Sequence, residues 1–162
     1  MTARLRLRPF EERDADALFA VFSDPAVGRF VGGPHASPDD SAALIARNRA
    51  HHARHGHSLW AVEERESGVL VGEAGLQLLE LVGPETEIGW TLGSPWWGRG
   101  YATEAARAWL DAAFTTLGLD AVIATVLPEN AASHAVARRL GMEHAGRRHV
   151  HGAEHDVYRA SR

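Results

Sequence analysis

Two glycines lie between a strand-like segment and a long helical one. Residues 85–92 have the pattern of a strand, and Gly98 and Gly100 follow in an irregular loop. An apolar stripe then repeats at helical spacing from Tyr101 to about Leu117, so the loop leads into a helix N-terminus. The first backbone N–H groups of a helix have no partner within it, and the helix dipole is positive there. Because glycine has no Cβ, a ligand can approach these N–H groups closely, and the loop predicts a site for an anion such as a pyrophosphate.

Two other phosphate-binding motifs do not fit this loop. A P-loop requires a lysine followed by Ser or Thr after its last glycine, and the residues after Gly100 are Tyr101 and Ala102. A dinucleotide fingerprint requires a third small residue where Thr103 stands and an acid at the end of the next strand. Asp120 stands at the beginning of that strand instead. A tight connection in which the glycines only permit the turn is the structural alternative.

A second helix start follows the next predicted strand. Asn130 can accept hydrogen bonds from the first N–H groups of a helix, and Ser133 stands in the first turn. Both helices follow strands, so we expect their N-termini at the same edge of the sheet, with a cofactor between them that contacts Asn130 and Ser133. A purely structural cap is the alternative interpretation of Asn130.

The hydrophobic periodicity predicts the element order β-α-α-β-β-β-α-β-α-β-β. This order is typical of a single α+β domain, here residues 1–162, in which helices pack on a mixed sheet. We expect Asp14 to cap the first helix and Asp24-Pro25 to end it. The predicted strands are residues 5–9, 58–63, 69–79, 85–92, 121–126, 144–149 and 154–159, and the later helices begin after Ser37, Gly100 and Asn130.

The composition excludes several classes of protein. The chain has 162 residues, of which 45% are hydrophobic and 23% charged, so it can form one core and is too apolar for intrinsic disorder. A formal net charge of −4 gives no reason to expect nucleic acid or an anionic membrane as a partner. The absence of cysteine excludes disulfides and a cysteine nucleophile. No apolar run reaches the ~18 residues of a membrane span, and the first residues lack the apolar stretch of a secretory signal. We therefore expect a cytoplasmic protein.

Several segments together resemble the GNAT superfamily of acetyl-CoA-dependent N-acetyltransferases, in the form of its RimJ/RimL-like branch. The residues Trp97-Gly98-Arg99-Gly100-Tyr101-Ala102-Thr103-Glu104-Ala105 are similar to its acetyl-CoA signature. The segments 5–10, 87–90, 126–133 and 139–142 match further motifs in the same order, so the resemblance covers nearly the whole chain. It implies an acyl-CoA N-acyltransferase fold, a mixed sheet of six to seven strands flanked by about four helices, with coenzyme A between the splayed fourth and fifth strands.

The resemblance also implies roles for individual residues. Backbone groups of Trp90, Thr91 and Leu92 would contact the pantetheine and the acetyl carbonyl, and Asn130 would bind the pantetheine arm. Arg138 or Arg139 would reach the adenosine phosphate, unless both are only solvated. The pyrophosphate would be wrapped by Gly98, Arg99, Gly100, Tyr101, Ala102 and Thr103. Two positions depart from the superfamily pattern, since Trp97 replaces the usual Gln or Arg and Ala137 replaces the tyrosine that often serves as general acid.

Acetyl transfer requires a neutral amine, a stabilised oxyanion and a proton for the departing thiolate. We expect Glu87 to be the general base, acting through water, because strand alternation puts it on the same face as Gly89 and Thr91. Its alternatives are a surface residue or a site for the substrate's ammonium group, and Glu73 on the neighbouring strand is the substitute base and a substrate-binding candidate. With Ala137 in the tyrosine position, the resemblance passes the acid role to Ser133 or to solvent.

The acceptor is a primary amine, either a protein N-terminus or a small molecule, which we expect to be attacked directly in a ternary complex. Phe30 and the first two helices are predicted to shape the acceptor pocket. A non-catalytic acetyl-CoA-binding module on the same fold is the alternative, and a nucleotide-dependent oxidoreductase is disfavoured by the loop. His51, His52 and His55 lack a convincing third ligand, so no metal is expected. The sequence leaves a homodimer open.

Overall fold

A computed structural model describes all residues from Met1 to Arg162. One seven-stranded sheet runs through the chain, with the spatial order β1-β2-β3-β4-β5-β7-β6. Every neighbouring pair is antiparallel except β4 and β5, which are parallel. The strands are β1 (Leu5–Arg8), β2 (Leu59–Glu64), β3 (Leu70–Leu78), β4 (Thr86–Leu92), β5 (Ala121–Val126), β6 (Glu143–Val150) and β7 (Ala153–Ser161). The predicted mixed sheet is confirmed, and β2, β3 and β4 form an antiparallel meander within it.

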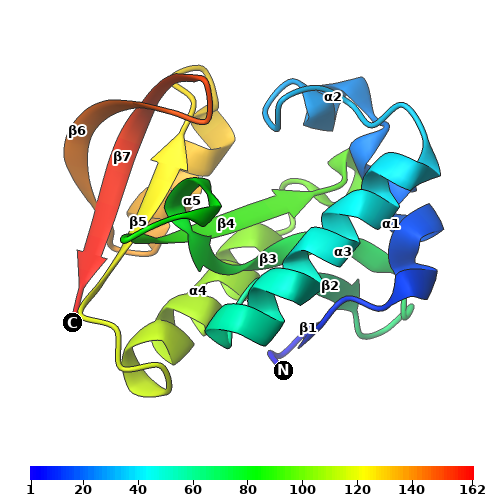
Figure 1. Cartoon of the computed structure of the whole chain (residues 1–162), viewed down its shortest axis with the longest axis horizontal. Helices are drawn as coiled ribbons and strands as arrows, with labels where there is room; N and C mark the ends of the chain where they lie inside the picture. Colours follow the sequence, from blue (N-terminus) through cyan, green and yellow to red (C-terminus); the bar gives the residue numbers. More distant parts are fainter.

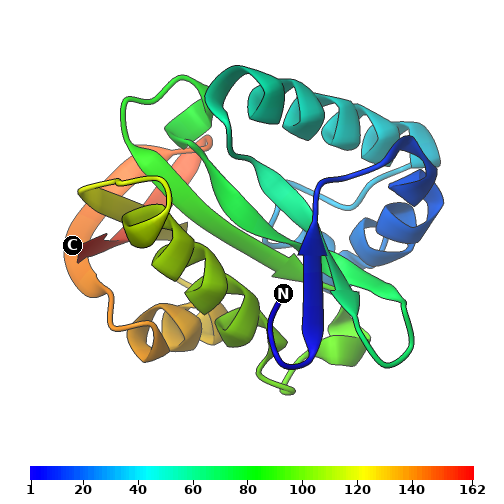
Figure 2. The same ribbon diagram turned by 90° about the horizontal axis from the view of Figure 1, so that it is seen from below.

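Five α-helices cover the two faces of the sheet. They are α1 (Ala15–Phe22), α2 (Pro25–Gly28), α3 (Pro38–His55), α4 (Tyr101–Thr115) and α5 (Ala131–Arg139). Figure 2 shows α3 and α4 on opposite sides of the strands. The number exceeds the expected four because α2, a single turn, is an additional helix.

The alternation of side chains along the strands produces two cores. Ala61 and Val62 are adjacent on β2 and both fully buried, yet they belong to different apolar clusters. Val62 packs with Trp109 and Leu110 of α4, while Ala61 packs with residues of α1 and α3 such as Leu18. The sheet is therefore buried on both faces, which positions α1–α3 on one side and α4 and α5 on the other.

The predicted start of α1 is wrong in detail and its predicted end is confirmed. Asp14 does not cap α1 with its side chain, because its carboxylate accepts hydrogen bonds from Arg8 and from the backbone N–H of Glu11. The helix ends at Phe22, just before Asp24-Pro25. Asp24-Pro25 also begins α2, where the Asp24 carboxylate accepts from the backbone N–H of Ala26 as an N-cap.

The start of α3 follows the prediction. Ser37 and Asp40 form a capping box, Pro38 takes the first helical position, and Gly56 ends the helix in the left-handed conformation. His51 in the last turns of α3 is buried, and its Nε2 accepts the backbone N–H of Leu78 at 3.3 Å. The C-terminal turn of α3 therefore packs on the end of β3.

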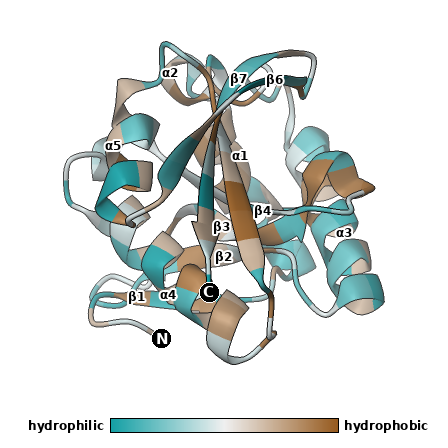
Figure 3. Cartoon of the chain, turned by 90° about the vertical axis from the view of Figure 1, so that its left-hand side faces the viewer, coloured by the Kyte–Doolittle hydropathy of each residue, from teal (hydrophilic) through white to brown (hydrophobic).

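The outer edge of the sheet is hydrophilic. Figure 3 shows β6 in the teal of polar residues, and most of its side chains are exposed. Charged side chains such as Arg147 and Arg148 on an edge strand discourage pairing with other chains. No helix of the structure combines the length and the apolar character needed to cross a membrane.

Candidate active site

The fourth and fifth strands separate almost as soon as they meet. Their only paired residues are Glu87 and Ile123, near the start of each strand, and β5 then diverges from β4 (Figure 1). A cleft of about 1430 Å³ opens there, lined by residues of β4, β5, the N-terminal parts of α4 and α5, and the α1–α3 side. The splay inferred from the family resemblance is thus present, and it lies at the carboxyl ends of two parallel strands.

The N-terminus of α4 has no internal cap. None of the six backbone N–H groups from Gly98 to Thr103 donates a hydrogen bond within the protein. Gly98 and Gly100 adopt φ values of +73° and +78°, which only glycine adopts without strain, and five of the six residues line the cleft. A Cβ at Gly98 would meet no protein atom within 4 Å, so its glycine leaves open space in front of the N–H groups. This arrangement can bind an anionic group such as a pyrophosphate.

The side chain of Arg99 does not line the cleft. Its guanidinium lies 3.6 Å from the carboxylate of Glu64, and the Tyr101 hydroxyl donates to the same carboxylate at 2.5 Å. The predicted role of Arg99 in phosphate binding is therefore limited to its backbone N–H group, and it stays a prediction. Tyr101 is buried in the α4 core, so only its backbone faces the loop.

The start of α5 faces β4 across the cleft. The Asn130 carboxamide oxygen accepts the backbone N–H of Ser133 at 3.1 Å, which confirms the predicted N-cap. The Trp90 indole Nε1 donates to Ser133 Oγ at 3.3 Å, so β4 and α5 are linked where the strands have parted. Ala137, at the position of the missing tyrosine, is completely buried and cannot act as an acid.

The free edge of β4 presents backbone groups to the cleft. Gly93 N–H bonds to Val71 on the β3 side, so alternation along the strand directs the N–H groups of Trp90 and Leu92 toward β5. The Leu92 carbonyl is on the same edge, where it accepts from Trp97 Nε1 at 2.7 Å. The N–H groups of Trp90 and Leu92, which have no strand partner on this edge, can bind an extended ligand with amide groups.

One face of β3 and β4 forms the floor of the cleft on the α1–α3 side. Thr91 lies opposite Glu73, Gly89 opposite Gly75, and Glu87 opposite Gln77. Ser58 and Leu59 lie over these glycines, since a Cβ at Gly75 would meet the Ser58 carbonyl oxygen and one at Gly89 would meet the Leu59 side chain. Phe30, from the segment after α2, lines the same cleft, and its role in the acceptor pocket stays a prediction.

Glu73 is a buried carboxyl group without a partner. Its side chain is 4% exposed, forms no hydrogen bond, and its Oε2 is an unsatisfied buried acceptor. Burial raises the pKa of Glu73 to about 7, and the nearby Arg47 guanidinium only partly opposes the effect. A carboxyl group of this kind is half ionised at neutral pH and can exchange a proton or receive a cation.

Glu87 is buried as well but fully surrounded by donors. Its carboxylate accepts from the Thr125 hydroxyl, from Gln77 Nε2 at 3.4 Å and from His151 Nε2 at 3.0 and 3.2 Å. The two carboxylates on one sheet face are therefore unlike: Glu73 has no partner, and Glu87 has three.

Comparison with known proteins agrees with this geometry. Residues 4–143 match the family model described as "Acetyltransferase (GNAT) domain". The chain belongs to the GNAT acetyltransferase family. This GNAT chain is 32% identical to the uncharacterized N-acetyltransferase YnaD of Bacillus subtilis, over 90% of its own length and 82% of that protein.

Two solved structures superpose on nearly the whole of this GNAT chain. An acetyltransferase from Agrobacterium tumefaciens superposes with a TM-score of 0.86 at 34% identity, covering 100% of this chain and 93% of the other. RimJ of Mycobacterium smegmatis, solved in complex with CoA-disulfide, superposes with a TM-score of 0.79 at 25% identity, covering 99% and 86%. The RimJ/RimL resemblance inferred from the motifs is thus confirmed, and acetyl-CoA is the acetyl donor of this family.

Two residues of the site of this GNAT chain are not predicted by its sequence patterns. His151 stands in the turn between β6 and β7, and Thr125 on β5, and both contact Glu87. No local signal marks them, because their positions depend on the pairing of β5 with β7 and on the hairpin β6–β7. The structure also distinguishes the two arginines left open for the adenosine phosphate, since Arg139 lines the cleft and Arg138 does not.

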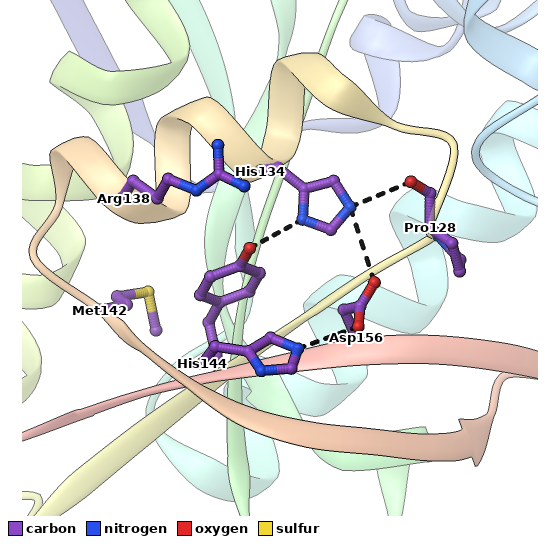
Figure 4. Close-up of a pocket in the computed structure, with 7 residues that line it drawn as sticks. Pro128, His134, Arg138, Met142, His144 and Asp156 are labelled. Carbon is purple, nitrogen blue, oxygen red and sulfur yellow. Dashed lines mark hydrogen bonds and ion pairs between the residues drawn. The ribbon is translucent and has the colours of Figure 1, made fainter.

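A second hollow of about 480 Å³ lies on the far side of α5 of the GNAT chain (Figure 4). His134 Nδ1 is 2.8 Å from the Tyr158 hydroxyl, and its Nε2 is 3.3 Å from the Pro128 carbonyl. Asp156 accepts from His144 Nε2 at 2.9 Å and from Arg147 Nε at 3.0 Å. These polar groups already have partners within the protein. They form a structural network that attaches the β6–β7 hairpin to α5.

Proposed function

We propose that the protein is an N-acetyltransferase that transfers the acetyl group of acetyl-CoA to a primary amine by direct attack in a ternary complex. The observation that carries this proposal is the row of six unpartnered N–H groups at the start of α4, which opens on the cleft where β4 and β5 part. The acceptor is a protein N-terminus or a small-molecule amine. A protein that binds acetyl-CoA in this cleft without acetylating an amine would be a non-catalytic binding module. The thiol-release assay distinguishes this module from an enzyme.

The residues around the cleft fit coenzyme A. In the proposal, backbone N–H groups from Gly98 to Thr103 hold the pyrophosphate, and the free edge of β4 at Trp90, Thr91 and Leu92 pairs with the pantetheine amides. The Asn130 side chain binds the pantetheine arm, and Arg139 reaches the adenosine phosphate. An N–H group of Trp90 or Leu92 is the donor for the oxyanion that forms on the thioester carbonyl.

The acceptor enters from the α1–α3 side, beside Leu59 and Gly89, which line the cleft. Glu73, with no partner of its own, receives the positive charge of the incoming ammonium group, and Phe30 lines the pocket. An ammonium group beside Glu73 would satisfy an acceptor that is otherwise buried at a cost.

The chemistry requires one proton to leave the amine before attack. Glu87 takes this proton through water, and the neutral nitrogen then forms its bond to the thioester carbon. As the carbon–sulfur bond breaks, the nitrogen gives up a second proton and the thiolate gains one. Ser133 Oγ donates a hydrogen bond to the sulfur, which orients and stabilises it.

The test is release of free thiol from acetyl-CoA against a panel of primary amines and peptide N-termini, followed by mass spectrometry of the product. We expect amine-dependent thiol release and a mass increase of one acetyl group for at least one acceptor. Thermal unfolding with acetyl-CoA, NAD and ATP is measured in parallel, because a ligand that binds only the folded state raises the melting temperature. Stabilisation by acetyl-CoA without turnover of any acceptor would support the binding module, and no stabilisation would contradict the proposal.

A further inference from the structure

The turn of the β6–β7 hairpin brings an imidazole into the cleft. His151 has a positive φ of 52°, and its backbone N–H donates to the Glu80 carboxylate at 2.8 Å. The ring then lies with Nε2 at 3.2 and 3.0 Å from the two carboxylate oxygens of Glu87. A non-glycine residue in this strained backbone conformation persists because its surroundings hold it there.

The hydrogen bond defines which ring nitrogen is free. Glu87 and His151 Nε2 can share one proton: an ionised Glu87 accepts it from Nε2, whereas a protonated Glu87 donates it to the Nε2 of a neutral ring whose own proton is on Nδ1. Its Nδ1 has no hydrogen-bond partner within the protein. The His151 side chain is 34% exposed and that of Glu87 only 7%, so the imidazole connects a buried carboxylate with solvent.

The proposed reaction produces a proton that must leave the site. An ammonium substrate and acetyl-CoA give an amide, free coenzyme A and one proton, because the thiolate recovers only one of the two protons that the nitrogen loses. Glu87 is buried beneath Gln77, Thr125 and His151. Of these three contacts only the imidazole can take up a proton near neutral pH.

We propose that His151 is a proton-relay residue that acts through Glu87: the unprotonated Nε2 takes the proton that Glu87 received from the acceptor amine, and the imidazolium so formed releases its Nδ1 proton to solvent. This inference rests on the proposed function, since it assigns a proton path to that reaction. It makes His151 a positioning residue, because Glu87 and a water stand between it and the substrate.

Three titratable groups face the imidazole, each from a different element. Glu87 comes from β4, Glu80 from the turn between β3 and β4, and His155 from β7 with its ring centroid 5.8 Å away. The hydrogen bond to Glu87, opposed in part by burial and helped by the charges of Glu87 and Glu80, raises the pKa of His151 above its ordinary value of 6.5. The contact with Glu87 therefore favours the imidazolium, which is the form that His151 adopts when it takes a proton from Glu87.

The decisive variant is His151→Gln, whose amide nitrogen can still donate to Glu87 but cannot titrate. We expect kcat at pH 7.5 to fall by about tenfold or more, and the rise of activity through neutral pH to disappear, with unchanged affinity for acetyl-CoA. His149→Gln is the matched control, because His149 is an exposed histidine of the same hairpin. A variant with kcat within twofold of the wild type, or one that is slower but keeps the pH dependence, overturns the proposal.

A second measurement requires no turnover. The NMR titration of His151 in the wild-type protein should give a pKa above 6.5, and Glu87→Gln should lower it. If no acceptor is found, the proposed function fails. The NMR titration still tests the interaction between His151 and Glu87. A His151 signal that titrates identically in the wild type and in Glu87→Gln refutes the relay, whatever the assays give.

Discussion

The indole nitrogen of Trp90 lies 3.3 Å from Ser133 Oγ, across the gap between β4 and α5. This contact joins the two elements that line the cleft after the strands have parted, and it holds the serine hydroxyl at the site proposed for the thioester sulfur. A serine hydroxyl is a weak acid, so its contribution is expected to be orientation of the leaving group.

The first prediction concerns this hydroxyl. Ser133→Ala should lower kcat by about tenfold while the dissociation constant of acetyl-CoA stays within twofold, because the hydroxyl acts on the leaving sulfur and not on the phosphates. The thiol-release assay and quenching of tryptophan fluorescence measure the two quantities. Unchanged turnover in this variant would remove Ser133 from the mechanism.

The second prediction concerns the backbone of the α4 loop. Gly98→Ala should weaken acetyl-CoA binding by about tenfold or more, since a Cβ would occupy the space in front of the N–H groups and a φ of +73° costs a non-glycine residue about 1 kcal/mol. Gly118→Ala is the matched control, because Gly118 has a φ of +66° and equally open surroundings away from the cleft. Equal loss of binding in both variants would mean that only stability had changed.

The third prediction concerns the pH dependence of stability. Burial raises the pKa of Glu73 from its ordinary value of 4.5 to about 7, so the folded state prefers the protonated carboxyl. The wild type should therefore lose stability relative to Glu73→Gln as the pH rises from about 4.5 through 7, by roughly 3 kcal/mol in total. Urea unfolding of both proteins at pH 5 and pH 8 measures the difference.

The control for this series is Glu66→Gln, at an exposed position in the β2–β3 turn, which should follow the wild type at both pH values. A constant difference between the wild type and Glu73→Gln at pH 5 and pH 8 would contradict an uncompensated buried carboxyl. Glu73→Gln should also raise the KM for the amine, since it removes the negative charge that receives the ammonium group.

The fourth prediction concerns the cap of α5. Asn130→Ala should lower the free energy of unfolding by about 1 kcal/mol, because Ser133 N–H loses its acceptor, and should weaken acetyl-CoA binding as well. Asn130→Asp keeps an acceptor and should restore most of the stability, whereas its added charge beside the cofactor should leave binding weak. Urea unfolding and fluorescence titration measure the two effects, and an Asp variant that binds acetyl-CoA as tightly as the wild type would argue against a contact with Asn130.

The positions of the helices and strands could be predicted from the sequence because they depend on local patterns of residues. Alternating apolar residues predicted the strands, and Ser37 and Asn130 predicted helix starts that the structure confirms. The loop around Gly98 and Gly100 predicted an anion site because unpartnered N–H groups are a property of any helix start. These features need no knowledge of what packs against them.

Only the tertiary structure decided how the charged residues divide their roles. Asp14 and Arg99 have partners far from the positions that their local sequence suggested. Glu73 and Glu87 are equivalent in strand pattern, yet one is left without a partner and the other is bound by Thr125 and His151 from distant segments. The reason is physical: helix and strand propensities act between neighbours in the chain, whereas the solvation and pairing of a carboxylate depend on whichever elements the fold brings over it.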